Sequence, residues 1–178
     1  MMQDSLTNPR RRIPIGCSTD KELVAAVGRK DRDALESLSQ MYFSRLACML
    51  RRLLLPDEAI DAVIIETFSA VWALAEDLEE ETKVSTWIIG IACRLAIQAL
   101  RITPTRAFDP HDQLSAALLR LPLEQRLTLT LAYQMGLSID EIGQTTESPA
   151  ALVQARMTLA RTSLRARALW ASLWLHFH

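Results

Sequence analysis

Apolar residues recur every three or four positions along most of this chain, which is the spacing of amphipathic α-helices. Runs of alternating β-branched residues are few, so the pattern favours an all-α fold. A first short helix is predicted where Thr19 and Glu22 have capping-box spacing. Further helices are expected over residues 31–54, 57–75, 83–101, 114–119 and 123–135. In the segment 57–75, the residues expected to face inward are Ile60, Ile64, Phe68, Val71 and Trp72.

The segment Leu137–Arg167 predicts a helix-turn-helix whose second helix is long. Ser138 and Glu141 form an S-x-x-E capping box at the start of one helix, and Ser148 with Pro149 is typical of the start of the next. The second helix has an apolar stripe and four arginines away from it: Arg156, Arg161, Arg165 and Arg167. This layout places a helix in the major groove of DNA in many proteins, although an ordinary helical hairpin has the same pattern.

A proline-bounded stretch separates two sets of predicted helices. Pro104 and Pro110 fall within Ile102–Asp112, which is therefore the best linker in the chain. The predicted fold is all-α, with two small helical domains joined by a short linker and a helix-turn-helix in the second. The expected parts are a flexible tail over 1–18, a four-helix domain over 19–101, the linker over 102–112 and the helix-turn-helix domain over 113–178.

Composition narrows the function classes further. The 178 residues carry a net charge of −1, but an acidic block at positions 76–81 contrasts with residues 150–167, which contain four arginines and no acid. Three isolated cysteines, three scattered histidines and five unclustered glycines predict no metal site, cofactor or enzyme. Without an apolar run of membrane-spanning length, the chain is expected to be soluble and cytoplasmic.

Motifs in both halves resemble those of extracytoplasmic-function sigma factors, a group of the sigma-70 family of RNA polymerase. The run KVSTWIIGIACRLAIQALR at residues 83–101 is similar to the family's second conserved region, and residues 66–72 resemble its E-T-F-x-x-V-W. LPLEQR at 121–126 and GLSIDEI at 136–142 resemble the fourth conserved region, as does the helix that follows Pro149. The resemblance covers about residues 20–167, in order and with matching spacing.

The resemblance implies partners for each part of the chain. Core RNA polymerase would dock on the third helix, where Asp61 and Glu66 are candidates, although both could simply lie on a solvated face. The fourth helix would face the −10 promoter element, where strand separation requires bases to leave the stack. Its candidate residues are Lys83, Thr86, Trp87, Arg94, Gln98 and Arg101. Packing in the core is an alternative role for Trp87.

The helix-turn-helix would read the −35 element. Ala151, Gln154, Ala155 and Thr158 would lie near bases, since glutamine can pair with adenine and methyl groups can contact thymine. Arg156 and Arg161 would hold phosphates, which position a protein without specifying sequence. The family also implies an anti-sigma partner that keeps the protein inactive.

Several departures from the family pattern fall on contact positions. Ile65 replaces a glutamine, Arg94 an asparagine and Glu147 the turn glycine, while Leu152, Gln154 and Leu159 replace polar or basic residues. Positions expected to hold the fold match the family pattern better than positions expected to contact DNA or polymerase. Two alternatives to a sigma factor therefore stay open: a sigma-like protein that binds proteins as an anti-sigma decoy, and a stand-alone helix-turn-helix regulator. The regulator would need a dimerisation element, for which the apolar tail over 170–178 is the candidate.

Overall fold

The computed structural model describes residues 19–102 and 113–176, and all regular structure within these ranges is helical. The all-α prediction is thereby confirmed. The predicted tail over 1–18, residues 103–112 of the predicted linker and residues 177–178 lie outside the described residues. The side chains of residues 166–176, including most of the apolar tail considered for dimerisation, also lie outside the description.

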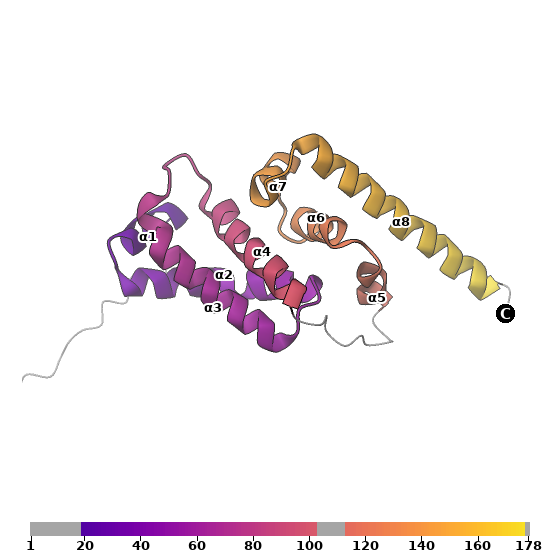
Figure 1. Cartoon of the computed structure of the whole chain (residues 1–178), viewed down its shortest axis with the longest axis horizontal. Coiled ribbons are helices and arrows are strands. Elements are labelled where there is room, and N and C mark those ends of the chain that lie inside the picture. Colours follow the sequence, from indigo (N-terminus) through magenta and orange to yellow (C-terminus); the bar gives the residue numbers. More distant parts are fainter. Residues whose placement is uncertain (1–18, 103–112, 177–178) are drawn as a thin grey trace, which may run out of the picture.

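Four helices form the N-terminal domain: α1 (Asp20–Gly28), α2 (Arg32–Arg52), α3 (Asp57–Leu74) and α4 (Val84–Ile102), as Figure 1 shows. Their starts follow local chemistry. Thr19 and Glu22 form the predicted capping box, and the Asp31 carboxylate accepts hydrogen bonds from the first backbone amides of α2. After α3 the chain makes a short 3-10 turn, η1 (Ala75–Asp77), and a loop. The Lys21 ammonium donates to the Glu80 carbonyl oxygen at 2.6 Å, which ties this acidic loop to α1.

The C-terminal domain contains α5 (Gln113–Leu119), α6 (Leu123–Tyr133), α7 (Ile139–Thr146) and α8 (Ala150–His176). Ser138 and Glu141 form the predicted capping box of α7. The predicted apolar stripe of α8 is present over residues 153–164, because Val153 and Ala160 are fully buried and Met157 and Leu164 are half-buried; Ala168, its last predicted member, lies outside the described side chains. The helix therefore presents one apolar edge to the domain and extends along it (Figure 1).

The two domains share one apolar core. The main cluster combines buried residues of α1 to α4 with Leu127, Leu131, Met135, Leu137, Ile142 and Val153 from the C-terminal domain. A smaller cluster lies entirely within the C-terminal domain and contains Leu118, Leu121, Leu129 and Ala160. The contact between domains runs mainly through α4 and α7, which pack against each other (Figure 1). The structure is therefore a closed arrangement, which a two-domain prediction alone does not specify.

The helix α4 is the apolar centre of the fold. By length and composition it could cross a membrane, so the expectation that no segment has this character was too strong. Its apolar residues are, however, used inside the protein: Ile88, Ile89, Ala92 and Ala96 are buried between α4 and its neighbours. Packing against α3 on one side and α7 on another explains why so few polar residues occur along this helix.

Candidate nucleic-acid interface

The turn between α7 and α8 is held tightly by backbone contacts. Glu147 takes the left-handed conformation, with φ 50° and ψ 41°, and donates its amide to the Gly143 carbonyl oxygen. Ser148 donates its own amide to the same oxygen at 2.9 Å. A Cβ atom at Gly143 would lie only 2.8 Å from the Ser148 carbonyl oxygen, so this position accommodates only glycine without a shift of the backbone. The turn therefore fixes the angle at which α8 leaves α7.

The outward face of α8 contains the residues predicted to lie near DNA bases. Ala151, Gln154, Ala155 and Thr158 are all exposed, and their spacing places them on one side of the helix. The Thr158 hydroxyl donates to the Gln154 carbonyl oxygen at 2.9 Å, one turn back. The structure thus brings together a small surface of methyl groups with a single amide side chain.

The two arginines predicted to hold phosphates lie in different surroundings. Arg156 is half-buried and donates from Nη1 to the Ser148 hydroxyl at 3.0 Å, so it also supports the turn. Arg161 is exposed and borders a groove of about 650 Å³ between α2, α6 and α8. Arg52 and Arg165 line the same groove, so Arg161 lies toward the N-terminal domain.

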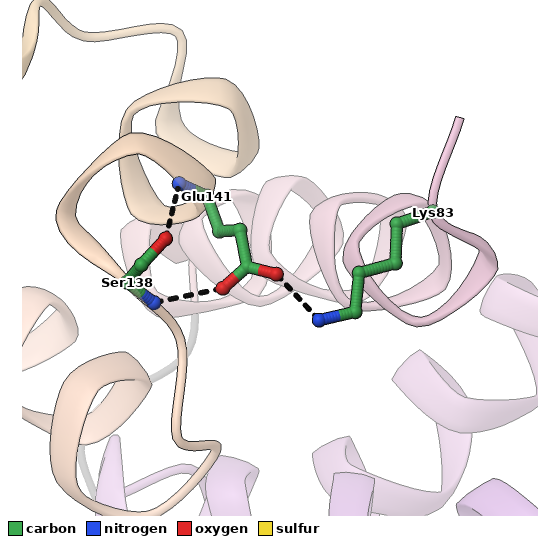
Figure 2. A network of polar contacts seen from close by, with 3 residues as sticks. All are labelled: Lys83, Ser138 and Glu141. Atoms are coloured by element: carbon green, nitrogen blue, oxygen red, sulfur yellow. Dashed lines mark hydrogen bonds and ion pairs between the residues drawn. The ribbon is translucent and has the colours of Figure 1, made fainter. Parts of the chain in front are cut away.

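The cations at the start of α4 meet acids of the C-terminal domain. Lys83 Nζ lies 2.5 Å from Glu141 Oε1, as Figure 2 shows. The other carboxylate oxygen of Glu141 accepts from the Ser138 backbone amide at 2.8 Å. The hydrogen bond from Lys83, followed by that from Ser138, lowers the pKa of Glu141 to about 2. A residue predicted for the −10 surface is therefore engaged by the cap of the helix-turn-helix.

A second ion pair joins α4 to the turn. Arg94 Nη1 lies 3.5 Å from Glu147 Oε1, and both side chains are largely exposed. Between the two pairs the helices touch closely, because a Cβ atom at Gly90 would lie 3.8 Å from the Thr145 carbonyl oxygen. Lys83, Gly90 and Arg94 follow one another at helical spacing. The α7 helix therefore covers the side of α4 that lies between two predicted DNA-contacting cations, and the cations themselves stay largely exposed.

The other predicted −10 residues are spread between surface and core. Gln98 and Arg101 are exposed in the last turns of α4. Trp87 is half-buried and packs against the main core cluster, which agrees with the packing role considered for it. Thr86 is 6 % exposed and its hydroxyl lacks a hydrogen-bond partner among the described residues, so it is not on the surface of the closed structure.

The face of α3 predicted to contact polymerase is exposed beside an apolar groove. Asp61 and Glu66 both lie at the surface. The groove, of about 700 Å³ between α2 and α3, has an apolar lining that includes Phe43, Ile65, Phe68 and Trp72, with Arg32 and Glu36 also lining it. Ile65 is 68 % exposed and Phe43 is 47 % exposed. Sequence reasoning treated Ile65 only as a lost glutamine and did not assign Phe43, although an aromatic residue off the apolar stripe of its helix was a usable signal.

Comparison with known proteins shows what each part of the chain is similar to. The family described as Sigma-70, region 4, matches residues 111–164, which include α6, α7 and the first half of α8. The ECF RNA polymerase sigma factor SigW of Bacillus subtilis (strain 168) is 22 % identical over 176 residues, covering 82 % of this chain and 94 % of SigW. The RNA polymerase sigma factor NccH of Alcaligenes xylosoxydans xylosoxydans is 23 % identical over 175 residues, covering 84 % and 94 %.

Solved structures have the same fold. CnrH in complex with the cytosolic domain of CnrY is similar with a TM-score of 0.74 at 22 % identity, covering 84 % of this chain and 96 % of CnrH. The sigma factor RpoE in complex with the anti-sigma factor NepR, from Bartonella quintana, has a TM-score of 0.62 at 16 % identity, covering 74 % and 96 %. The fold, the region 4 match and the full-length relatives agree with the motifs in both domains. Its C-terminal domain matches the Sigma-70, region 4, family, and the chain over most of its length is similar to sigma factors of the extracytoplasmic-function group.

Proposed function

We propose that this protein is a sigma factor that binds core RNA polymerase and directs it to promoters from the cytoplasm. The observation that carries the proposal is the exposed face of α8, which follows a tightly fixed turn within the region 4 match. There Gln154 can pair with an adenine edge, and the methyl groups of Ala151, Ala155 and Thr158 can contact thymine methyl groups. This face would read the −35 element in the major groove.

The N-terminal domain would act at the −10 element through α4. Bases leave the stack when the strands separate, and cations that hold the backbone offset part of that cost. Gln98 and Arg101 are exposed and available in the closed structure. Lys83 and Arg94 would have to leave their acidic partners first.

Core polymerase would dock on the groove between α2 and α3. The apolar residues of the groove can contact the apolar face of a helix. Asp61 and Glu66 on the exposed face of α3 can pair with basic residues of that partner. Among the structural relatives, CnrH is bound to CnrY and RpoE to the anti-sigma factor NepR. By analogy with them, an anti-sigma partner of this chain would cover parts of both domains and keep it inactive.

Reconstituted run-off transcription tests the proposal. Purified chain is mixed with core polymerase on genomic promoter fragments, and specific transcripts that require the chain are expected. Pull-down of core polymerase without specific transcripts would instead favour an anti-sigma decoy. This is the second candidate because Ile65, Leu152 and Leu159 depart from the family pattern and because Lys83 and Arg94 are paired with acids. If the chain fails to bind core polymerase, both polymerase-based proposals are wrong.

The phosphate-binding role of the arginines on α8 can be measured separately. Replacing Arg156 and Arg161 together by glutamine should weaken promoter binding and reduce the slope of log affinity against log salt by about 1.8, because each phosphate contact on duplex DNA contributes about 0.9. Replacing both by lysine keeps the charge and should keep most of the slope. An unchanged slope in the glutamine variant would show that neither arginine holds a phosphate.

A further inference from the structure

At the contact between α4 and α7, two acids lie beside two cations that the fold would otherwise present to DNA. Glu141 pairs with Lys83 at one end of the contact, and Glu147 pairs with Arg94 further along α4. Around Gly90 the two helices lie close together, because a Cβ atom added there would meet the Thr145 carbonyl oxygen at 3.8 Å, an ordinary van der Waals contact. The side of α4 between the two cations is therefore covered by protein.

Local structure holds the Glu141 side chain in place and gives Glu147 an uncommon backbone conformation. Glu141 belongs to the capping box of α7, where its second carboxylate oxygen accepts from the Ser138 amide, so the side chain cannot swing away freely (Figure 2). Glu147 has a left-handed backbone, which residues other than glycine, asparagine and aspartate adopt at a cost of roughly 1–2 kcal/mol. Glu147 keeps this conformation and also places its carboxylate beside Arg94. Backbone strain of this kind is often found at functional positions, which suggests a functional role for the carboxylate.

We propose that Glu141 and Glu147 form an autoinhibitory latch, in which two carboxylates occupy the phosphate-binding cations Lys83 and Arg94 and hold the domains closed over α4. The inference rests on the proposed role of α4 in DNA binding. The carboxylates act as substitutes for phosphate oxygens, so DNA must displace them before it can use these cations. In the closed form, the chain therefore binds nucleic acid weakly.

The latch is weak enough to open. Both ion pairs include a largely exposed cation, and ion pairs at a protein surface are screened by salt. The apolar contact between the domains provides the rest of the closing free energy. A partner or a DNA strand that competes for Lys83 and Arg94 can therefore displace the two carboxylates.

The test uses a full-length Glu141→Gln/Glu147→Gln variant. Glutamine at position 141 still completes a capping box, and glutamine at 147 preserves side-chain length, so the variant keeps the fold while both ion pairs are lost. The matched control is Glu124→Gln/Asp140→Asn, which removes two exposed acids of the same domain and changes the net charge equally. Helix content and urea midpoints of all variants establish that each is folded.

Binding of a fluorescein-labelled dT20 oligonucleotide is measured by anisotropy from 0.05 to 0.3 M salt. Because each contact with a single strand contributes about 0.7 to the slope of log affinity against log salt, release of both cations should steepen it by about 1.4 relative to the control. If the latch variant and the control bind equally at 1 M salt, this difference in slope makes the latch variant bind about 25-fold more tightly at 0.1 M salt.

Two results would overturn the latch. One is a slope equal to that of the control variant. The other is a steeper slope that persists when Lys83→Gln and Arg94→Gln are added to the latch variant, because other cations would then be responsible. Failure of the proposed function is distinguishable: the dT20 slope would steepen as expected, whereas core polymerase would give no transcripts with any variant.

Discussion

Two buried glycines should respond in opposite ways to the same substitution. Gly90 lies within α4 and Gly143 within α7, and replacing either with alanine should gain about 1 kcal/mol of helix propensity. At Gly90 the new Cβ meets its nearest neighbour at 3.8 Å, which is an ordinary contact. Gly90→Ala should therefore stabilise the chain by up to about 1 kcal/mol.

At Gly143 steric conflict should exceed that gain. The new Cβ would lie 2.8 Å from the Ser148 carbonyl oxygen, so the turn has to open by about 0.6 Å to restore an ordinary contact. Overpacking of this kind costs about 1–3 kcal/mol. The hydrogen bond from the Ser148 amide to the Gly143 carbonyl oxygen, at 2.9 Å, lies at the same place, and its loss adds about 1 kcal/mol. Gly143→Ala should destabilise the chain by about 1–3 kcal/mol in total.

Urea unfolding followed by circular dichroism measures both effects. The midpoint should rise for Gly90→Ala and fall for Gly143→Ala, with similar m-values for both if the two variants unfold in the same way. Binding of duplex DNA adds a second readout, because a wider turn changes the direction of α8. If the two variants shift the midpoint equally and in the same direction, the steric account of the turn is wrong.

Three further outcomes follow from local chemistry. Ser138→Ala should lower the free energy of unfolding by about 1 kcal/mol through loss of the capping box, measurable in urea. The pKa of Glu141 is lowered to about 2 in the folded chain, so its carboxylate stabilises the fold above the unfolded pKa of about 4.3 and loses this effect as the pH falls toward 2. The difference in the free energy of unfolding between wild type and Glu141→Gln should therefore shrink as the pH falls from about 4.3 toward 2. Burial raises the pKa of the Cys93 thiol to about 12, so in a Cys17→Ser chain at pH 7.5 a thiol reagent should label the exposed Cys48 and leave Cys93 unmodified until unfolding.

Helix starts and the inward faces of helices could be predicted because their causes are local. A capping box depends on two residues three positions apart, so Thr19 with Glu22 and Ser138 with Glu141 identified the first turns of α1 and α7. Likewise, the apolar spacing within α3 correctly indicated that Ile60, Ile64 and Val71 face the core, because burial follows helical periodicity.

The candidate site could be predicted less completely because its contacts join distant parts of the chain. Lys83 and Glu141 are 58 positions apart, and no local pattern indicates that a capping residue also meets a lysine of another domain. The burial of Thr86 has the same origin, since a polar residue on α4 becomes inaccessible only once the domains pack. Arg161 looked equivalent to Arg156 by sequence, yet helical rotation places it at a groove that faces α2.

Two departures from the family pattern are connected in space. Taken one at a time, an arginine in place of asparagine at Arg94 and a glutamate in place of glycine at Glu147 suggest damage to DNA contacts and to the turn. In the structure their side chains form an ion pair at 3.5 Å between α4 and the turn that orients α8. Each substitution therefore provides the partner of the other, and reverting either one alone would leave an unpaired charge in this contact. Departures at contact positions are thus better explained here by a closed state of the protein than by a simple loss of DNA binding.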